Sequence, residues 1–417
     1  MTPYERQAIE AAASTVRACQ SCDSTDLELG ISLGYLPACN DFKPIGDMTP
    51  TKVYQHDVYF CPRCGLAQLG HVPPQTETFP VSYPYTSSTT RALRDNFRDL
   101  YEEHRKIAPL SPGDLVIDIG GNDGNLLSHW PRENVRLNVT PEDMGKRGAE
   151  HGVIHHQAYW SAATARDVVN SYGTARLITA TNVFSHVPDL HDFLDGVLDA
   201  LSPGGIFAIE FQSLTDLLRG AYFDNIYTEH ARFNSLQSIR HQLSAHDMIV
   251  IGARSIPTHG GSIRVYATRK GEERACPLDP ATRIFEDGVT LYDFQEFRAK
   301  VEKHRRDLRR TIGEIRGLGM RIVGIGAPSR ASTLVSYCGL NADDLECVYE
   351  VAGSHKLGKW MPGTRIEIRE EPTAFGDDQP EVALLLSHHV GHEMVKAWRA
   401  KGFKGRFIWP LPTVRVE

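Results

Sequence analysis

The sequence lacks any run of eighteen uncharged apolar residues, and its N-terminus has no basic stretch followed by an apolar core. We therefore expect neither a membrane-spanning helix nor a secretory leader, and we expect a cytoplasmic protein. Basic residues are also few, because 45 Lys and Arg face 52 Asp and Glu, a net charge of −7. Nucleic-acid binding relies on clustered Lys and Arg. This balance favours small-molecule substrates and argues against nucleic-acid or membrane partners.

Cysteine is sparse, with 8 in 417 residues, but four of them form two Cys-x-x-Cys pairs about 40 residues apart. Such clustering indicates a metal site rather than disulfides in a reducing compartment. Two pairs can present four thiolates to one tetrahedral Zn²⁺, which leaves no open position for catalysis. Cys39 lies between the pairs without a partner at ligand spacing and is left out. The expected structural zinc ligands are Cys19, Cys22, Cys61 and Cys64.

A glycine-rich motif follows an apolar stretch in Leu115-Val-Ile-Asp-Ile-Gly-Gly-Asn-Asp-Gly-Asn-Leu-Leu127. A strand that ends in such a turn is typical of a nucleotide-binding α/β domain, because bare glycine backbone lets a ligand approach closely. The acidic residue precedes the glycines, and the Gly-x-Gly-x-x-Gly spacing of dinucleotide folds is absent. This order suits S-adenosylmethionine (SAM), whose sulfonium and amino groups are cationic. The alternative is a tight turn without a ligand.

Strand-like and helical stretches alternate from Leu115 to about Thr268, with candidate strands over 136–140, 175–182 and 205–212. This pattern predicts a parallel sheet covered on both faces, with a ligand beyond the carboxyl ends of its strands. The candidate cofactor-binding residues at that edge are Asp118, Gly120, Gly121, Asn122, Asp123, Leu127, Asn182 and Phe211.

The chain is long enough for three cores, since 41% of its residues are apolar. A charged amphipathic helix is expected within 270–316, with Phe297, Val301 and Leu308 near a common face and its charges solvated. We expect an α/β protein with a Cys₄ zinc-binding domain (1–75), a Rossmann-like SAM methyltransferase domain (76–268), a helical connector (269–316) and a smaller Rossmann-like domain (317–417).

The segment 222–234 carries Tyr227, Glu229 and His230 within four residues. A His beside a carboxylate can have its tautomer and basicity set by that neighbour, and an imidazole with a pKa of about 6.5 matches the needs of a general base at neutral pH. A His with only a structural role is the alternative. The position of this loop after a ligand-bearing strand favours catalysis.

A second strand and glycine turn lie in Met320-Arg-Ile-Val-Gly-Ile-Gly-Ala-Pro-Ser-Arg330. Ser329 and Arg330 at a helix N-terminus suit a diphosphate, whereas the turn lacks the third glycine of an NAD site. His388, His389 and His392 do not match a zinc-protease motif and are interpreted as a polar helix start. Further strands are expected near 345–349, 382–386 and 405–409.

Together these features resemble the SAM-dependent sugar C-methyltransferases that act on nucleotide-linked 4-keto deoxysugars, such as the C-3 enzymes of branched-sugar antibiotic pathways. The resemblance covers nearly the whole chain, and the Tyr-x-Glu-His element is its most specific part. It rests on the two cysteine pairs and, in the family's order, on Tyr83–Ser88, Asp118–Gly124, Asn182–His186, Tyr227–His230, His259–Arg264, Gly326–Pro328 and Met361–Thr364.

The resemblance implies methyl transfer from SAM to a carbon, C3, beside the C4 ketone of a sugar on a nucleoside diphosphate, with dTDP the expected nucleotide. It also implies a monomer or homodimer. His230 would be the base, and Tyr85, Tyr227 and Glu229 would surround the sugar. The implied substrate-binding residues are Ser329, Arg330, His259 and Ser262.

Two positions depart from the family pattern. Thr140 stands before Pro141 where relatives place an acidic residue that holds the SAM ribose, and Glu142 is the candidate replacement. Ser329-Arg-Ala331 replaces an Ala-Lys-Gly sequence.

Two other classes share some of these features. A zinc-containing RNA methyltransferase would share the cysteine pairs and the SAM fold, but it should present a basic, aromatic face that this acidic chain lacks. A nicotinamide-dependent oxidoreductase would use the C-terminal glycine turn. Binding of SAM, NADH and a nucleotide sugar would discriminate the three.

Overall fold

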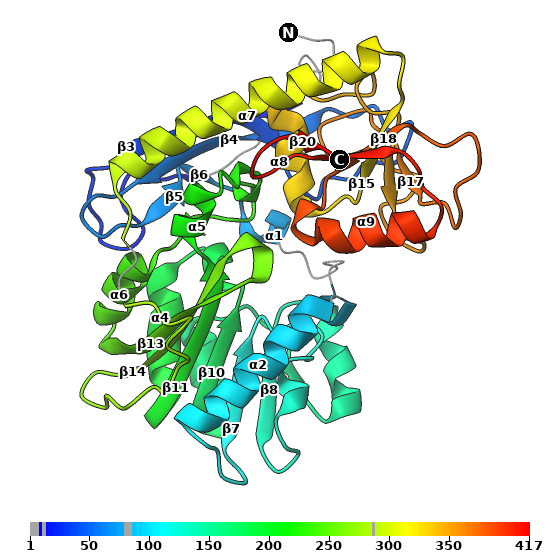
Figure 1. The fold of residues 1–417 in the computed structure, drawn as a ribbon. Helices are drawn as coiled ribbons and strands as arrows, with labels where there is room; N and C mark the ends of the chain where they lie inside the picture. The colour runs from blue at the N-terminus through cyan, green and yellow to red at the C-terminus, as the bar shows by residue number, and fades with distance from the viewer. Residues whose placement is uncertain (1–7, 11–13, 79–85, 90, 286–287) are drawn as a thin grey trace.

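The computed structural model describes the chain except for residues 1–7, 11–13, 79–85, 90 and 286–287. Figure 1 shows a central α/β lobe at the bottom. Above it lie the N-terminal sheet and a C-terminal α/β unit, both beneath the long helix α7 (Leu291–Gly317). The expected α/β class with a cysteine-bearing N-terminal part is confirmed.

The N-terminal sheet is built around one long antiparallel hairpin. Its strands are β1 (Ala8–Glu10), β3 (Glu28–Pro37), β4 (Thr51–Phe60), β5 (Ala67–Leu69) and β12 (Arg232–Phe233). A separate two-stranded sheet of β2 (Ser14–Thr15) and β6 (His71–Val72) and the short helix α1 (Gln75–Thr78) complete this part of the chain. The second cysteine pair lies in the turn between β4 and β5. β12 comes from the central region and pairs antiparallel with β5, so the chain returns to the N-terminal sheet. A strand of two residues shows no sequence pattern, and its pairing was not predicted.

The central sheet has seven strands in the order β13-β14-β11-β10-β7-β8-β9. They are β7 (Leu115–Ile119), β8 (Val135–Val139), β9 (Ile154–His156), β10 (Ala175–Thr181), β11 (Leu201–Gln212), β13 (Met248–Ile256) and β14 (Ser262–Arg269). The five strands from β11 to β9 are parallel as predicted, whereas β14 runs antiparallel to β11 and to β13. The short turn after β13 explains this difference, because parallel neighbours need a long crossover connection.

Helices cover both faces of this sheet. They are α2 (Arg91–Ile107), α3 (Ala162–Tyr172), α4 (Leu190–Ala200), α5 (Leu214–Arg219) and α6 (Leu236–Ser244), with short 3-10 turns η2 (Ser87–Thr89), η3 (Leu127–His129), η4 (Asp143–His151), η5 (Phe184–His186), η6 (Phe223–Asn225) and η7 (Thr258–Gly260). Val116 and Leu177 pack in one cluster with α2, whereas Ile117 and Ile178 pack in another with α3 and α4. Successive strand residues therefore face opposite sides, and the doubly covered sheet is confirmed.

The C-terminal unit has a six-stranded sheet in the order β17-β16-β15-β18-β19-β20. Its elements are β15 (Ile322–Ile325), α8 (Ser329–Tyr337), β16 (Val348–Glu350), β17 (Ile368–Glu370), β18 (Val382–Leu385), η8 (His388–Val390), α9 (Gly391–Ala400), β19 (Arg406–Trp409) and β20 (Arg415–Val416). All strands except β20 are parallel. The order reverses between β15 and β18, and such switch points form ligand crevices beyond the strand ends.

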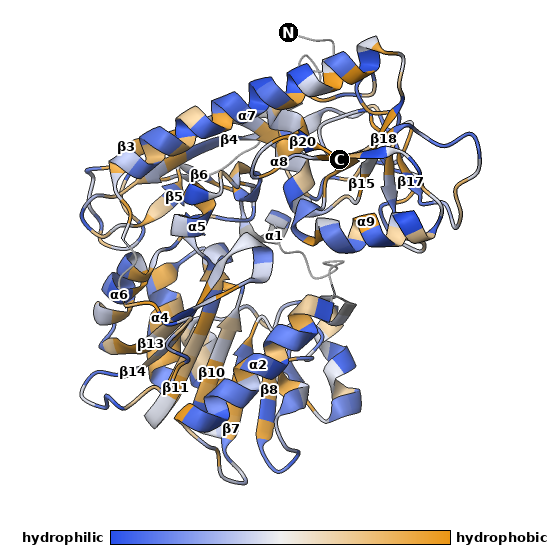
Figure 2. Cartoon of the chain, viewed as in Figure 1, coloured by the Kyte–Doolittle hydropathy of each residue, from blue (hydrophilic) through white to orange (hydrophobic). Residues whose placement is uncertain are grey.

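The helix expected within 270–316 begins only at Leu291, after a capping box formed by Thr290 and Asp293. Its predicted apolar face is buried, and the ring centroid of Phe294 lies 5.5 Å from that of Phe60 in the N-terminal sheet. Figure 2 shows hydrophilic residues along the outer face of α7. The helix is thus part of one hydrophobic cluster that joins the N-terminal sheet to the C-terminal unit. None of the helices in the described ranges is long and apolar enough to cross a bilayer.

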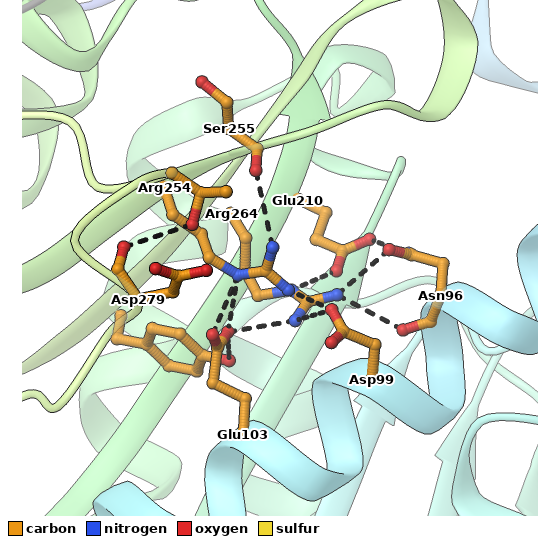
Figure 3. A network of polar contacts seen from close by, with 10 residues as sticks. Asn96, Asp99, Glu103, Glu210, Arg254, Ser255, Arg264 and Asp279 are labelled. Atoms are coloured by element: carbon orange, nitrogen blue, oxygen red, sulfur yellow. Dashed lines mark hydrogen bonds and ion pairs between the residues drawn. The ribbon is translucent and has the colours of Figure 1, made fainter.

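A buried ion-pair network fixes α2 to the central sheet (Figure 3). Arg264 on β14 is fully buried, and its Nε donates to Glu210 of β11 at 2.5 Å. Its Nη1 donates to Asp99 at 2.9 Å and to Glu103 at 3.0 Å, both on α2. Arg254 on β13 pairs with the same two carboxylates. Each buried carboxylate of the network therefore has a cationic partner.

Removal of the central cation should destabilise the fold. We expect Arg264→Met to lower the free energy of unfolding by about 3–5 kcal/mol, because Glu210 would remain buried without compensation. Urea denaturation measures this loss. Arg166→Met, at an exposed position of α3, is the matched control and should cost less than about 0.5 kcal/mol. Equal losses in the two variants would contradict a stabilising role for the network.

Candidate functional site

The predicted catalytic residues lie on the loop between η6 and β12. The ring centroids of Tyr227 and His230 are 4.0 Å apart, and the ring of His186 in η5 is 4.9 Å from that of His230. His186 Nδ1 donates to the carbonyl of Glu229 at 2.7 Å and ties this loop to the end of β10. Three of the four predicted residues therefore converge. Tyr85 lies outside the described residues and stays a prediction.

A backbone carbonyl orients the imidazole of His230. Its Nδ1–H donates to the carbonyl oxygen of Asn225 at 2.8 Å, so the neutral ring keeps its lone pair on Nε2. We expected Glu229 to set this tautomer, and that expectation is wrong. Burial lowers the pKa of His230 well below its ordinary value, and His186 acts in the same direction. The ring is therefore unprotonated at neutral pH and can accept a proton, but its intrinsic basicity is lower than we expected.

Two neighbouring side chains, Tyr227 and His259, are also uncharged. Burial, followed by the charge of Glu229, raises the pKa of Tyr227 well above its usual range, so its hydroxyl stays a hydrogen-bond donor. Burial lowers the pKa of His259 to about 4, with a further contribution from Arg330. His259 Nε2 is buried and has no hydrogen-bond partner among the described residues. Ser262 Oγ instead donates to a carbonyl of its own turn, at 3.0 Å.

Asp224 in η6 links the loop with His230 to the C-terminal unit. Arg330 of α8 binds its carboxylate bidentately, with Nε and Nη2 at 2.7 and 2.9 Å. His388 Nε2 donates to the same carboxylate at 2.7 Å. Burial favours a protonated Asp224, but the charges of Arg330 and His388 outweigh it and hold its pKa well below the usual range. His388 is thus part of a buried clamp and not merely a polar helix start.

The turn before α8 presents further polar groups. Ser329 Oγ donates to Asn40 Oδ1 at 3.2 Å, so Ser329 already contacts the N-terminal domain. Lys356 Nζ donates to the Ala327 carbonyl at 2.7 Å, and Glu350 at the end of β16 accepts from the Ala327 amide at 2.9 Å. With Arg330 bound to Asp224, the predicted diphosphate contacts of Ser329 and Arg330 stay predictions.

The glycine-rich loop after β7 leaves no room for side chains. Gly120 has a φ of +65°, and a Cβ there would lie 2.5 Å from Val183. A Cβ on Gly121 would lie 2.5 Å from the Asp118 carboxylate and 2.7 Å from Asn138. Both glycines are therefore required by the loop itself, and a larger residue would disturb it even without a ligand.

Carboxylates gather at the carboxyl edge of the central sheet. Asp118 Oδ1 accepts from Thr179, whereas its buried Oδ2 has no partner in the described part of the chain. Burial raises the pKa of Asp118 to about 7. Glu142 accepts from Asn122 at 3.1 Å and from Thr140 at 3.2 Å, which places this carboxylate beside the loop as the replacement proposed for Thr140 requires.

The other predicted cofactor residues divide into two groups. Asp123 accepts from the Ser87 hydroxyl at 2.7 Å, and the backbone N–H of Asn182, just after β10, donates to the backbone carbonyl of Glu210. These residues shape the loop and the strand end. Leu127 and Phe211 are fully buried within two hydrophobic clusters. Direct contacts of all these residues with a cofactor stay predictions.

The four predicted cysteine ligands meet at one point. Their sulfur atoms all lie within 4.8 Å of one another, and the Cys19–Cys64 and Cys22–Cys61 distances are 3.4 and 3.6 Å. Four sulfurs at this spacing fit a tetrahedral Cys₄ zinc site. No other group of three or more such ligands occurs in the described ranges.

Sequence reasoning missed three members of the site: Asn40, Asp224 and His388. It included His186 within the segment Asn182–His186 but gave it no separate role. Asn40 follows Cys39, which we set aside because it had no metal-ligand spacing. Asp224 and His388 are 164 residues apart, and no local pattern relates them.

Three family models match the chain in succession. They describe a zinc binding domain over residues 19–79, a methyltransferase domain over 91–251 and a C-methyltransferase C-terminal domain over 257–412. The C-methyltransferase NovU of Streptomyces niveus is 29% identical over 408 residues, which cover 95% of this chain and 96% of NovU. These matches support the C-methyltransferase family that the motifs indicate.

Two solved structures match this chain over less than half of its length. A SAM-dependent methyltransferase from Clostridium acetobutylicum has 12% identity and a TM-score of 0.33, and covers 43% of this chain and 92% of its own. A SAM-dependent methyltransferase from Anabaena variabilis has 12% identity and a TM-score of 0.33, and the match covers 42% of this chain and 84% of that protein.

The residues present fit both expected cofactors. A free buried carboxylate oxygen on Asp118 and the narrow glycine loop suit the cationic amino acid part of SAM, and Glu142 suits its ribose hydroxyls. The cysteine cluster suits structural zinc. The enzyme is therefore a SAM-dependent methyltransferase with a zinc-binding domain, as predicted.

Purified enzyme should contain about one zinc per chain, because four thiolates close one coordination sphere. Cys19→Ser should lose the metal and lower the thermal midpoint by more than about 5 °C, since a structural zinc contributes folding energy. Cys276→Ser, at a buried cysteine outside the cluster, is the control and should keep its zinc. Active wild-type protein without zinc in metal analysis would contradict this prediction.

SAM affinity should depend on pH through Asp118. Because its pKa is raised to about 7, the carboxyl is mostly protonated at pH 6 and mostly ionised at pH 8. Wild-type affinity should therefore rise by about tenfold between these values. Asp118→Asn should bind SAM weakly at both. Calorimetry measures this, with Asp143→Asn, at an exposed acid of η4, as the control that keeps the pH dependence. A pH dependence that persists in Asp118→Asn would assign it to another group.

Proposed function

We propose that this enzyme methylates the carbon next to the ketone of a nucleotide-diphosphate-linked 4-keto deoxysugar, at C3. The observation that carries this proposal is the neutral His230, whose Nε2 lone pair lies in a site bounded by a phenol, two further imidazoles and the N-terminus of α8. Such an arrangement supports removal of a proton from carbon.

Methylation of carbon requires a carbanion equivalent, and a neighbouring ketone acidifies the proton that must leave. His230 Nε2 accepts that proton, and its Nδ1–H bond to Asn225 keeps the ring in place. The hydroxyl of Tyr227 then donates to the enolate oxygen, where negative charge develops. SAM supplies a methyl group on a sulfonium. The protein holds the two reactants in line.

The low basicity of His230 in the free enzyme does not oppose this role. When the imidazole takes up the proton, the enolate carries a negative charge beside it, and an opposite charge within a few ångströms raises the pKa of an imidazolium. His186 and His259, both with pKa values lowered by burial to about 4, remain neutral and add no competing charge.

The C-terminal unit supports a nucleotide-linked substrate. Its parallel strand order places the N-terminus of α8, Lys356 and Glu350 around one crevice edge. Amide groups at a helix N-terminus and a Lys side chain suit a diphosphate, and a carboxylate at the end of β16 suits ribose hydroxyls. We propose dTDP as the nucleotide. After Gly326 the turn continues with Pro328 and Ser329 and lacks the third glycine of a dinucleotide-binding motif. This sequence favours a nucleotide sugar over a nicotinamide cofactor at this crevice.

His230→Ala should reduce methyl transfer by about 10²-fold or more and leave SAM binding nearly intact. It should equally slow exchange of the substrate's α-proton with deuterated water when S-adenosylhomocysteine replaces SAM. Mass spectrometry with a panel of nucleotide-linked keto sugars measures both. At saturating SAM, the kcat of the wild-type enzyme should also be retained below pH 6.5, because the pKa of His230 lies well below that value.

His151→Ala, at an exposed histidine of η4, is the matched control and should retain full rates. If exchange and turnover both persist in His230→Ala, the base lies elsewhere and Tyr85 is the next candidate. If the wild-type enzyme methylates none of the keto sugars, the substrate class is wrong.

A further inference from the structure

The loop after β3 carries the N-terminal domain into the catalytic centre. Its first contact is the Pro37 carbonyl, which accepts from the Thr228 hydroxyl at 3.3 Å. Three residues later, Asn40 Nδ2 donates to Glu229 Oε1 at 2.5 Å. Both contacts join segments about 190 residues apart in the sequence. The zinc-binding domain therefore touches the catalytic loop directly.

The amide of Asn40 is used on both sides. While Nδ2 donates to Glu229, Oδ1 accepts from the Ser329 hydroxyl of α8 at 3.2 Å. An amide is the side chain that offers a donor and an acceptor from one planar group. An Asp at this position could not donate to a carboxylate. The contact is thus specific for the residue present, and it connects all three parts of the chain.

Glu229 is an ionisable group in a crowded, buried position. Titratable groups that face it include the Cys39 thiol from the same N-terminal loop and the Tyr227 phenol from its own loop. Burial keeps both protonated, so neither places a second negative charge beside the carboxylate. A donated hydrogen bond from Asn40 favours the ionised form of Glu229 and fixes the direction of its oxygens.

We propose that Asn40 is a positioning residue for methyl transfer, which orients the Glu229 carboxylate toward the sugar and makes the zinc-binding domain part of the active centre. This inference rests on the proposed function, with Glu229 ionised and beside the sugar, the place that the resemblance implies for it. It explains why a closed metal site accompanies this catalytic loop. Zinc holds the domain that presents Asn40, and the metal takes no part in the chemistry.

Two variants test the role. Asn40→Ala removes the donor, and Asn40→Asp sets a second carboxylate against Glu229, which should raise the pKa of the pair. We expect kcat to fall by about tenfold or more in both. In Asn40→Asp the acidic limb of the pH profile of kcat/KM should move upward by about one unit or more, because ionised Glu229 is needed. Zinc content and SAM affinity should stay at wild-type values.

Asn170→Asp, at an exposed position of α3, is the matched control and should leave the pH profile unchanged. A carbon-13 NMR titration of labelled Glu carboxyls, assigned with Glu229→Gln, measures the pKa of Glu229 without turnover. A raised pKa of Glu229 in Asn40→Ala supports the inference even if the enzyme methylates none of the keto sugars. That second result would overturn only the proposed substrate. An unchanged Glu229 pKa with wild-type kcat in both variants would overturn the inference. So would a loss of activity that parallels loss of zinc.

Discussion

The buried carboxylate of Asp224 is the contact on which the geometry of the loop with His230 depends. It is fully enclosed, and an ionised group in such a place is tolerated only with charged or hydrogen-bonded partners. Arg330 and His388 supply them from two separate elements of the C-terminal unit. Loss of one partner of a buried pair typically costs about 3–5 kcal/mol. The loop with His230 can therefore take this conformation only when the C-terminal unit is folded against it.

The same dependence appears in the hydrophobic core. Residues of the N-terminal sheet, α5, α7 and the C-terminal unit form a single cluster, whereas the central sheet has clusters of its own. The small N-terminal sheet therefore has two sources of stability: the cluster of four cysteines, and a hydrophobic core that it shares with α7 and the C-terminal unit. Phe294 of α7 rests on Phe60, and this contact joins sequence segments on either side of the methyltransferase lobe. The molecule therefore has two lobes: the central sheet with its helices, and the N-terminal sheet together with α7 and the C-terminal unit. The loop with His230 connects them.

Charge is distributed unequally between the lobes. Carboxylates such as Asp118 and Glu142 lie at the edge of the central sheet, where a cationic cofactor is expected. Arg330 and Lys356 lie on the C-terminal side, where the proposed substrate carries its phosphates. Between them, burial keeps His230 and its neighbours neutral. Each ligand would thus meet the opposite charge, and the proton acceptor would start uncharged.

Features with a local cause could be predicted from the sequence. The cysteine spacing indicated the metal cluster, and the apolar stretch before Gly120 indicated β7 and its loop. The Tyr227 to His230 element indicated the loop in which the rings of Tyr227 and His230 meet. These predictions succeeded because thiolate spacing, strand periodicity and glycine conformation act over a few residues. The antiparallel β14 and the late start of α7 were missed, since a short turn and a helix cap decide them.

The tertiary structure decided which distant groups meet. Asn40, Asp224 and His388 join the site from segments far apart in the chain, and a periodic pattern carries no information about such contacts. It also decided the protonation states, because the pKa of His230 depends on burial and on His186 rather than on its neighbour Glu229. The sequence by itself therefore determined the chemical groups and the local elements that carry them. Packing determined their partners and charges, because desolvation and hydrogen bonding act through space.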